Sequence, residues 1–201
     1  MMKTILAVLL AAALPVLAAA EEKTWSYDGP EPGPDGVLVI NGCRIEPKTR
    51  CPGADLRFAD LKDQNLAGAD LTGAKLVRAD FSDANLRGAK LDAANLMGAK
   101  FQRAFMQRSS ARGADLRAAD FDHAKASGSD WSGADLTAAS LEMLQANKIR
   151  LKGANLTDAD LQEAKLYDAD LSGANLTGAS KFFTIFEGAY MADCVACPLN
   201  W

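Results

Sequence analysis

Four cysteines and one histidine are the residues of this chain best suited to redox, metal or nucleophilic chemistry. Cys194 and Cys197 have the two-residue spacing of a redox-active dithiol, but no strand and helix pattern surrounds them. Pro198 follows where a covalent haem motif requires histidine. His123 has no second histidine and no reactive thiol to work with, so we expect a solvated surface side chain. We predict no catalytic residue, no metal site and no cofactor.

Paired carboxylates are the second chemical possibility, because glycoside hydrolysis uses two acids. Asp80 and Asp83 are such a pair, and they define an enzyme hypothesis by loose analogy with other proteins of elongated β architecture. An active site also needs a pocket in which acid, base and orienting groups converge. The repetitive chain described below offers flat outer faces instead, which favours a protein that is not an enzyme.

The composition indicates an ordered protein with a thin core. Hydrophobic residues make up 49% of the 201 residues and charged residues 24%, whereas aromatic residues make up only 7%. Such a core must be built mainly from leucine and alanine. Nothing in the charge balance indicates a nucleic-acid partner.

The N-terminal 20 residues are typical of a secretory signal peptide. Lys3 supplies the basic start, residues 5–17 an apolar run, and Ala18, Ala19 and Ala20 the small residues before cleavage. The apolar run is shorter than the ~20 residues of a membrane span and contains Pro15. We expect cleavage after Ala20 and a periplasmic or secreted product without a membrane span. Its formal charge would be −5, from 21 basic and 26 acidic residues.

A five-residue repeat runs without insertion from residue 54 to residue 193. It comprises 28 units such as Ala54-Asp55-Leu56-Arg57-Phe58, with alanine first in 22 and Leu, Phe, Met or Trp third in 24. Neither a helix period of 3.6 nor a strand period of 2 fits, so the chain must turn in the same way at every unit. We predict that the first and third side chains point inward and the other three outward.

These A(D/N)LXX units resemble the pentapeptide-repeat family, of which the chain would be an exported bacterial member. The resemblance implies an all-β fold: a right-handed quadrilateral β-helix with four units per coil. The 28 units would then form about seven coils, a rod about 34 Å long at a strand spacing of ~4.8 Å.

Four units per coil would place residues twenty apart in one column. Leu56, Leu76 and Leu96 should lie over one another, and Phe81, Phe101 and Phe121 should form an interior ladder. Trp131 occupies an interior position, and Ala111 and Ala126 near it suggest volume compensation; the alternative is an outward Trp131 beside a distorted corner.

The repeat divides the chain into segments. We expect a flexible Pro- and Gly-rich linker at 21–36, an N-terminal β cap at 37–53, the solenoid at 54–193 and a C-terminal cap at 194–201. Asn41-Gly42 lies between two apolar runs, as in a β-hairpin. The solenoid is expected to be irregular at 140–150, where Leu144 and Ile149 replace alanine and a short helical excursion is one interpretation.

The rod length that the resemblance implies also limits the cysteine pairs. One pair precedes the rod and the other ends it, and a disulfide spans less than ~7 Å between Cα atoms. The pairs Cys43 with Cys51 and Cys194 with Cys197 remain, and a single four-cysteine zinc site is disfavoured. Export would place these cysteines in an oxidising compartment.

Two surfaces are candidates for binding. Before residue 141 one face would carry an acidic docking stripe against three cations, and the adjoining face would carry Arg87, Arg108 and Lys125 with no acid. The stripe comprises Asp60, Asp63, Asp80, Asp83, Asp120 and Asp122. Near the C terminus Phe182, Phe183, Phe186 and Tyr190 form either a dimer patch, as in some members of the resembled family, or a plug of the last coil.

The sequence thus favours a non-enzymatic exported binding or scaffold protein whose partner is a protein or an envelope polymer. The alternative comes from the resembled family, in which DNA-mimicking proteins protect topoisomerases from quinolones. Export separates this chain from that target. A duplex also carries one charge per ~1.7 Å, so a mimic of this length would need about 20 negative charges.

Overall fold

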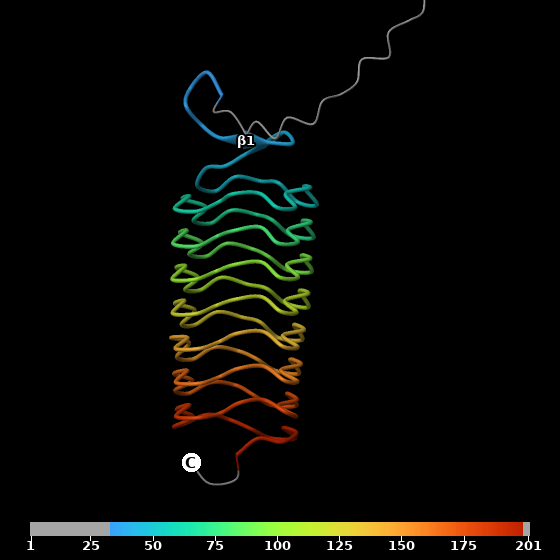
Figure 1. Ribbon diagram of the computed structural model, residues 1–201, viewed down its shortest axis with the longest axis vertical. Helices are drawn as coiled ribbons and strands as arrows, with labels where there is room; N and C mark the ends of the chain where they lie inside the picture. Colours follow the sequence, from blue (N-terminus) through green and yellow to red (C-terminus); the bar gives the residue numbers. More distant parts are fainter. Residues whose placement is uncertain (1–32, 199–201) are drawn as a thin grey trace, which may run out of the picture.

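A tube of stacked coils dominates the molecule (Figure 1). The computed structural model describes residues 33–198, and the predicted signal peptide lies outside them. β1 (Val39–Ile40) and β2 (Cys43–Arg44) pair as an antiparallel hairpin at the N-terminal end. Parallel bridges then join residues twenty positions apart, from Arg50 with Asp70 to Asn175 with Val195. Each coil therefore contains four five-residue units. Within the described range no helix has the length and hydropathy of a membrane span.

Backbone hydrogen bonds explain why a five-residue period keeps its shape. The Leu56 N–H donates to the Lys75 carbonyl of the next coil at 2.8 Å, and the Lys75 N–H donates to the Ala54 carbonyl at 2.9 Å. At the junction of two units, the Ala59 N–H donates to the Leu56 carbonyl at 3.2 Å and closes a turn. Because this pattern recurs along the tube, neighbouring coils satisfy the polar backbone groups that short sides cannot satisfy alone.

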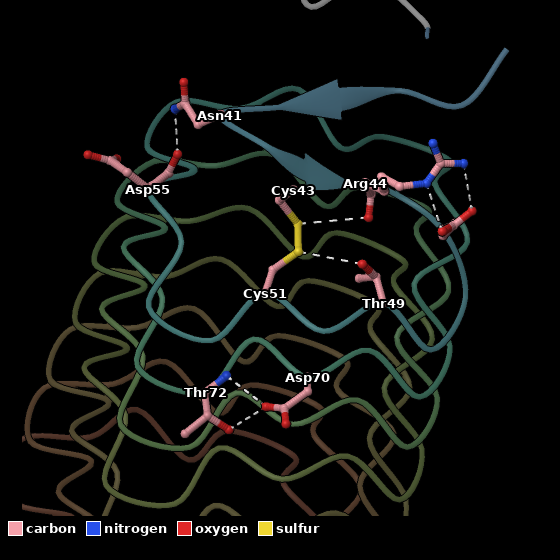
Figure 2. Close-up of a disulfide and its surroundings, with 9 residues drawn as sticks. Asn41, Cys43, Arg44, Thr49, Cys51, Asp55, Asp70 and Thr72 are labelled. Carbon is pink, nitrogen blue, oxygen red and sulfur yellow. Dashed lines mark hydrogen bonds and ion pairs between the residues drawn. A yellow bond between two sulfur atoms is a disulfide. The ribbon is translucent and has the colours of Figure 1, made fainter. Parts of the chain in front are cut away.

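The turn also explains which residues fill the outward positions. Asp70, at the second position of its unit, accepts hydrogen bonds from the Thr72 N–H at 3.3 Å and the Thr72 hydroxyl at 2.8 Å (Figure 2). Asp and Asn favour such contacts with the backbone two residues on. The fifth position has a positive φ, 69° at Gly68 and 60° at Phe58, which glycine adopts at the least cost. The second position is therefore structural as well as solvent-facing.

The interior consists of leucine columns with alanine between them. Leu56, Leu76 and Leu96 are at most 1% exposed, and the bridges that align their units place them over one another. Phe81, Phe101 and Phe121 are fully buried and nearly parallel, with ring centroids 5.0 Å and 4.8 Å apart. Contacts between stacked rings stabilise the fold beyond what the burial of their apolar surface contributes.

Trp131 lies inside the tube and crosses it. Its side chain is fully buried, and its ring centroid lies 4.7 Å from that of Phe121, which stands on the opposite side of the coil. Ala111 precedes Trp131 in its own column, and Ala126 occupies the side between Phe121 and Trp131. Both alanines are fully buried. The small side chains leave the volume that the indole fills.

Residues 140–150 correct one expectation. They stay in the ladder, with bridges from Gln145 to Lys165 and from Arg150 to Asp170, and no helical excursion forms. Leu144 and Ile149, which replace alanine, are both buried to within 1%. Ala146, at a position that usually holds leucine, frees the volume that the larger neighbours need. The register of all four sides therefore continues past residue 141.

The N-terminal end is closed by the hairpin. Asn41 and Gly42 both have positive φ, 48° and 79°, as a two-residue hairpin turn requires. The Asn41 amide donates to the Asp55 carbonyl at 2.6 Å and ties the turn to the first coil (Figure 2). The expected linker ends earlier than residue 36, because the Gly33 N–H donates to the Val37 carbonyl at 2.7 Å. Of the predicted linker, residues 21–32 lie outside the described range.

Candidate functional site

The four sides of the tube carry different charges, and two adjacent sides differ most. We call the side that contains residues 60–63 and every equivalent segment twenty residues on, to 180–183, the acidic side. The next side, from 65–68 to 185–188, is called the basic side. The acidic side carries nine acids and four cations, whereas the basic side carries five cations and two acids, both near its C-terminal end. The tube is therefore polarised around its axis.

The acidic side contains the whole predicted stripe and continues beyond it to Glu142, Asp160 and Glu163. Three members of the stripe also hold turns in place. Each accepts a backbone N–H two residues on, at 3.0 to 3.2 Å; they are Asp60, Asp80 and Asp120. Sequence reasoning assigned these carboxylates to the surface alone, because the turn contact depends on backbone geometry.

Ion pairs between neighbouring coils engage two of these nine acids, Asp83 and Asp80. Arg103 binds Asp83 from one coil further on, with its Nε donating to the carboxylate at 2.8 Å. This hydrogen bond lowers the pKa of Asp83. Lys62 and Lys100 lie 3.4 Å and 4.0 Å from the Asp80 carboxylate.

Asp80 shows how burial and hydrogen bonding compete at such a site. Partial burial is the largest single influence and would raise the pKa of Asp80. Hydrogen bonds from Ser82 and Lys62 together outweigh it and keep the pKa below its ordinary value. The Ser82 hydroxyl donates at 2.6 Å. Asp80 and Asp83 are thus engaged by separate partners, and the sequence hypothesis of a catalytic pair finds no support in these contacts.

His123 lies on the acidic side, half exposed, with Nδ1 2.6 Å from the Asp122 carboxylate. Among residues 33–198 no group of three histidine, cysteine or acidic side chains is placed to hold a metal ion.

The basic side lacks this internal compensation. None of its five cations forms an ion pair with the residues that the structure describes; they are Arg87, Arg108, Lys125, Lys148 and Lys165. Arg87 and Lys125, from the coils before and after, instead lie over the Phe105 ring, with their charged groups 4.6 Å and 5.0 Å from its centroid. Such cation–π contacts favour a cation over an aromatic ring without neutralising it.

A solvent-open hollow of about 770 Å³ lies at the edge of the basic side. Three cations line it together with polar side chains and two glycines; the lining residues are Arg87, Gly88, Gln107, Arg108, Ser127, Gly128, Asn147 and Lys148. A Cβ at Gly88 would meet nothing within 4 Å, so the space over this residue is open. Sequence reasoning found Arg87, Arg108 and Lys125 but missed Lys148, because the expected irregularity at 140–150 ended the column assignment.

The aromatic cluster near the C terminus separates into two parts. Phe186 is 4% exposed and closes the last coil, whereas Phe182, Phe183 and Tyr190 are 70%, 80% and 62% exposed. The proposed plug is thus Phe186 alone. Phe182 and Phe183 lie on the acidic side and Tyr190 on the opposite side of the tube, so they expose apolar surface at two places near its end.

Both expected cysteine pairs are joined in the structure. Cys43 and Cys51 link the hairpin to the first coil, with Cα atoms 5.7 Å apart (Figure 2). Cys194 and Cys197 lie at the other end, with Cα atoms 5.8 Å apart. No free cysteine remains in the described residues.

The comparisons with known proteins agree on the fold. The family model for pentapeptide repeats matches eight copies over residues 54–92, 79–117, 114–153 and 147–180. No curated protein matches the sequence. Among solved structures, HetL, a pentapeptide-repeat protein involved in heterocyst differentiation regulation in the cyanobacterium Nostoc, is 35% identical over 73% of this chain and 71% of its own, with a TM-score of 0.44.

A second solved structure gives the better superposition. A trypsin-treated form of QnrB1, a plasmid-mediated fluoroquinolone resistance protein, is 20% identical over 71% of this chain and 79% of its own, with a TM-score of 0.55. At this identity the likeness concerns the fold, a right-handed β-helix. The repeat register, the stacked interior and the family match together establish that this chain belongs to the pentapeptide-repeat family.

Proposed function

We propose that this protein is an exported, non-catalytic binding or scaffold module that recognises its partner through the charged sides of the tube. The observation that carries the proposal is the polarity between the acidic and basic sides. A rigid surface with opposite charges on adjacent sides can orient a partner and accelerate its encounter. The exposed groups are short polar and charged side chains, which suit recognition of a protein or an envelope polymer.

A periplasmic or secreted location is part of this proposal. The N-terminal 20 residues have the composition of a signal peptide. The four cysteines stand in two pairs at disulfide distance, and such pairs persist in oxidising compartments. Cell fractionation with an N-terminal sequence of the product tests it. We expect a periplasmic or extracellular chain that begins at Glu21, and a cytosolic, unprocessed product would contradict the proposal.

The predicted acidic stripe remains a docking candidate within the acidic side. Asp63 and Glu163 are outward fifth-position acids of this side, so they are free to be neutralised without touching the second-position turn contacts. Asp158 and Asp193 occupy the same position on other sides of the tube, with φ of 57° and 58°. These four residues provide a matched pair of double substitutions.

Affinity capture from envelope extracts with residues 21–201 is the direct test of the binding role. We expect a retained partner at ~0.1 M salt, where the Debye length is about 10 Å, and its release at ~1 M, where it is about 3 Å. The double substitution Asp63→Asn with Glu163→Gln should weaken capture through the acidic side, whereas Asp158→Asn with Asp193→Asn should not. Capture of nothing at low salt would refute the binding role, and equal losses in both doubles would refute the acidic side as its basis.

DNA mimicry is the second candidate, favoured by the fold that the chain shares with QnrB1. The uncompensated cations of the basic side weigh against it, because a polyanion mimic presents negative charge. A gyrase protection assay with the mature chain separates the candidates; protection from a quinolone would support mimicry.

Self-association through the C-terminal end is a further part of the proposal. Phe182, Phe183 and Tyr190 expose apolar surface of the kind found at interfaces. We expect a concentration-dependent dimer in analytical ultracentrifugation that Phe183→Ser disrupts. A monomer at all concentrations would refute this point without affecting the charged sides.

A further inference from the structure

The hollow on the basic side combines features that the other sides of the tube lack. Arg87, Arg108 and Lys148 line it within a span of four successive coils, and the glycines at 88 and 128 keep it open. Three arginines on other sides of the tube instead pair with carboxylates: Arg103 with Asp83, Arg112 with Asp92, and Arg150 with Asp130. The cations of the hollow thus have their charges available for an anionic group from outside the molecule.

A second feature of the hollow is a hydrogen-bond acceptor that lacks a donor. The Gln107 side-chain oxygen is buried and has no hydrogen-bond partner among the described residues. A buried acceptor without a donor costs free energy, and a small rotation of this half-buried side chain would present the oxygen to a ligand hydroxyl in the hollow. Ser127 and Asn147 lie in the same lining and can exchange hydrogen bonds with further hydroxyls. A simple anion such as phosphate would engage the cations but would leave this acceptor unsatisfied.

The arrangement of the cations fits an extended ligand that lies along the tube axis. Arg108 and Lys148 occupy the same column forty residues apart, which is two coils or about 9.6 Å at a spacing of ~4.8 Å. Gly128 separates them in that column. A linear polymer with charged groups at intervals would meet these cations in turn, with its hydroxyls over Gln107.

An acidic peptide fits less well. One recurring way for a peptide to bind a sheet is to add a strand at an open edge. The backbone of this side is already paired between coils: the Arg108 N–H donates to the Ser127 carbonyl at 3.2 Å, and the Lys148 N–H donates to the Tyr167 carbonyl at 2.7 Å. The surface offers side chains rather than backbone groups.

We infer that this hollow binds an acidic polysaccharide, with carboxylate groups on Arg87, Arg108 and Lys148 and a sugar hydroxyl on Gln107. The inference rests on the proposed binding role and names the class of ligand. Binding is non-covalent and needs no cofactor. The ligand would run along the basic side and leave the acidic side free for a protein.

The test uses polygalacturonate as the carboxylate-bearing probe, with dextran as a neutral polysaccharide and inorganic polyphosphate as a polyanion without hydroxyls on its backbone. Binding to residues 21–201 is measured by isothermal titration calorimetry at low and high salt. We expect polygalacturonate to bind, dextran not to bind, and added salt to weaken binding. The triple substitution Arg87→Gln, Arg108→Gln and Lys148→Gln should weaken it by about tenfold or more, because it removes charge-assisted hydrogen bonds.

A matched control removes the same charge from other sides. Lys75, Arg78 and Lys90 form no ion pair within residues 33–198, and their triple replacement by Gln changes the net charge equally. We expect this control to bind polygalacturonate almost as the wild type does. An equal loss of polygalacturonate affinity in both triple variants would mean that the polymer is attracted by the overall charge of the protein. That result would overturn the assignment of the hollow as its binding site.

Single substitutions at two positions sharpen the assignment. Gly128→Asp places a carboxylate at the hollow, and Asp63 and Asp83 show that Asp accepts this fifth position, with φ of 58° and 61°. We expect Gly128→Asp to weaken binding far more than Gly128→Asn. Gln107→Leu should weaken polygalacturonate binding and leave any binding of polyphosphate unchanged. Binding of polyphosphate that is as tight as that of polygalacturonate, with no effect of Gln107→Leu, would overturn the polysaccharide assignment.

The outcomes also separate this inference from the proposed function. If the mature chain captures an envelope partner in a salt-sensitive manner but binds no polygalacturonate, the polysaccharide assignment fails while the binding role stands. If the captured partner proves to be a protein, and the triple substitution of Arg87, Arg108 and Lys148 abolishes its capture, then the hollow is a protein interface and the inference is wrong.

Discussion

The acidic and basic sides share one backbone geometry but differ in both their interior and their exterior. Under the acidic side the interior column is bulky, with Phe81, Phe101 and Phe121 at its centre. Under the basic side the same levels hold Leu86, Met106 and Ala126. Outside, two acids of the acidic side form ion pairs with Lys or Arg side chains of neighbouring coils, whereas the cations of the basic side form none with the described residues. A repeat that fixes the backbone thus leaves each side free to acquire its own packing and its own charge.

The largest expected difference between the two sides concerns the interior. Phe101→Ala removes the middle ring of the stack and leaves a cavity, so we expect it to cost about 3 to 5 kcal/mol of unfolding free energy. Met106→Ala, one unit further on under the basic side, should cost about 2 to 5 kcal/mol and less than Phe101→Ala. Chemical denaturation of both variants measures the difference. A smaller loss for Phe101→Ala would show that the ring stack is not the better packed column.

Trp131 provides the second test, because it fills the space that small residues leave on its side and on the basic side. Ala111→Leu should overpack the indole and cost about 1 to 3 kcal/mol. The double substitution Ala111→Leu with Trp131→Leu restores an ordinary leucine column, and it should recover part of that loss. Thermal and denaturant unfolding measure both variants. Unchanged stability in Ala111→Leu alone would contradict volume compensation.

The third test uses pH to separate the two sides. Arg103 lowers the pKa of Asp83, and Asp80 also has a lowered pKa. A carboxylate whose folded pKa is depressed stabilises the protein above its unfolded value of 3.8, and this stabilisation is lost as the pH falls through the folded pKa. We expect stability to fall below about pH 4, with the wild type losing more than Asp83→Asn over the same range. Neutralising Lys148, which has no acidic partner, should leave this profile unchanged.

The smallest effect should come from the aromatic contact on the basic side. Arg87→Gln removes one of the two cations over the Phe105 ring and should cost about 0.5 to 1 kcal/mol. A double-mutant cycle with Phe105→Leu isolates the interaction. A coupling energy of zero would mean that Arg87 is held there only by its position on the coil, and that it is free to turn fully toward a ligand.

The sequence by itself determined the turn at every fifth residue, the burial of the third position and the hairpin at Asn41-Gly42. These features are local or strictly periodic, so one unit contains most of the information that its fold requires. The stacks of Leu56, Leu76 and Leu96 and of the three phenylalanines follow from the number of units per coil. That number came from the resemblance, because no local pattern fixes how many turns close a coil.

Only the tertiary structure decided the rest. It kept residues 140–150 in register, because the volumes of Leu144, Ala146 and Ile149 balance across neighbouring positions that the unit pattern treats separately. It also placed Lys148 two coils from Arg108 in one column, with a hollow between them over Gly128. Charges and gaps that lie twenty or forty residues apart become a surface only when coils stack, and that is why the basic side could be assembled from the structure and only partly from the sequence.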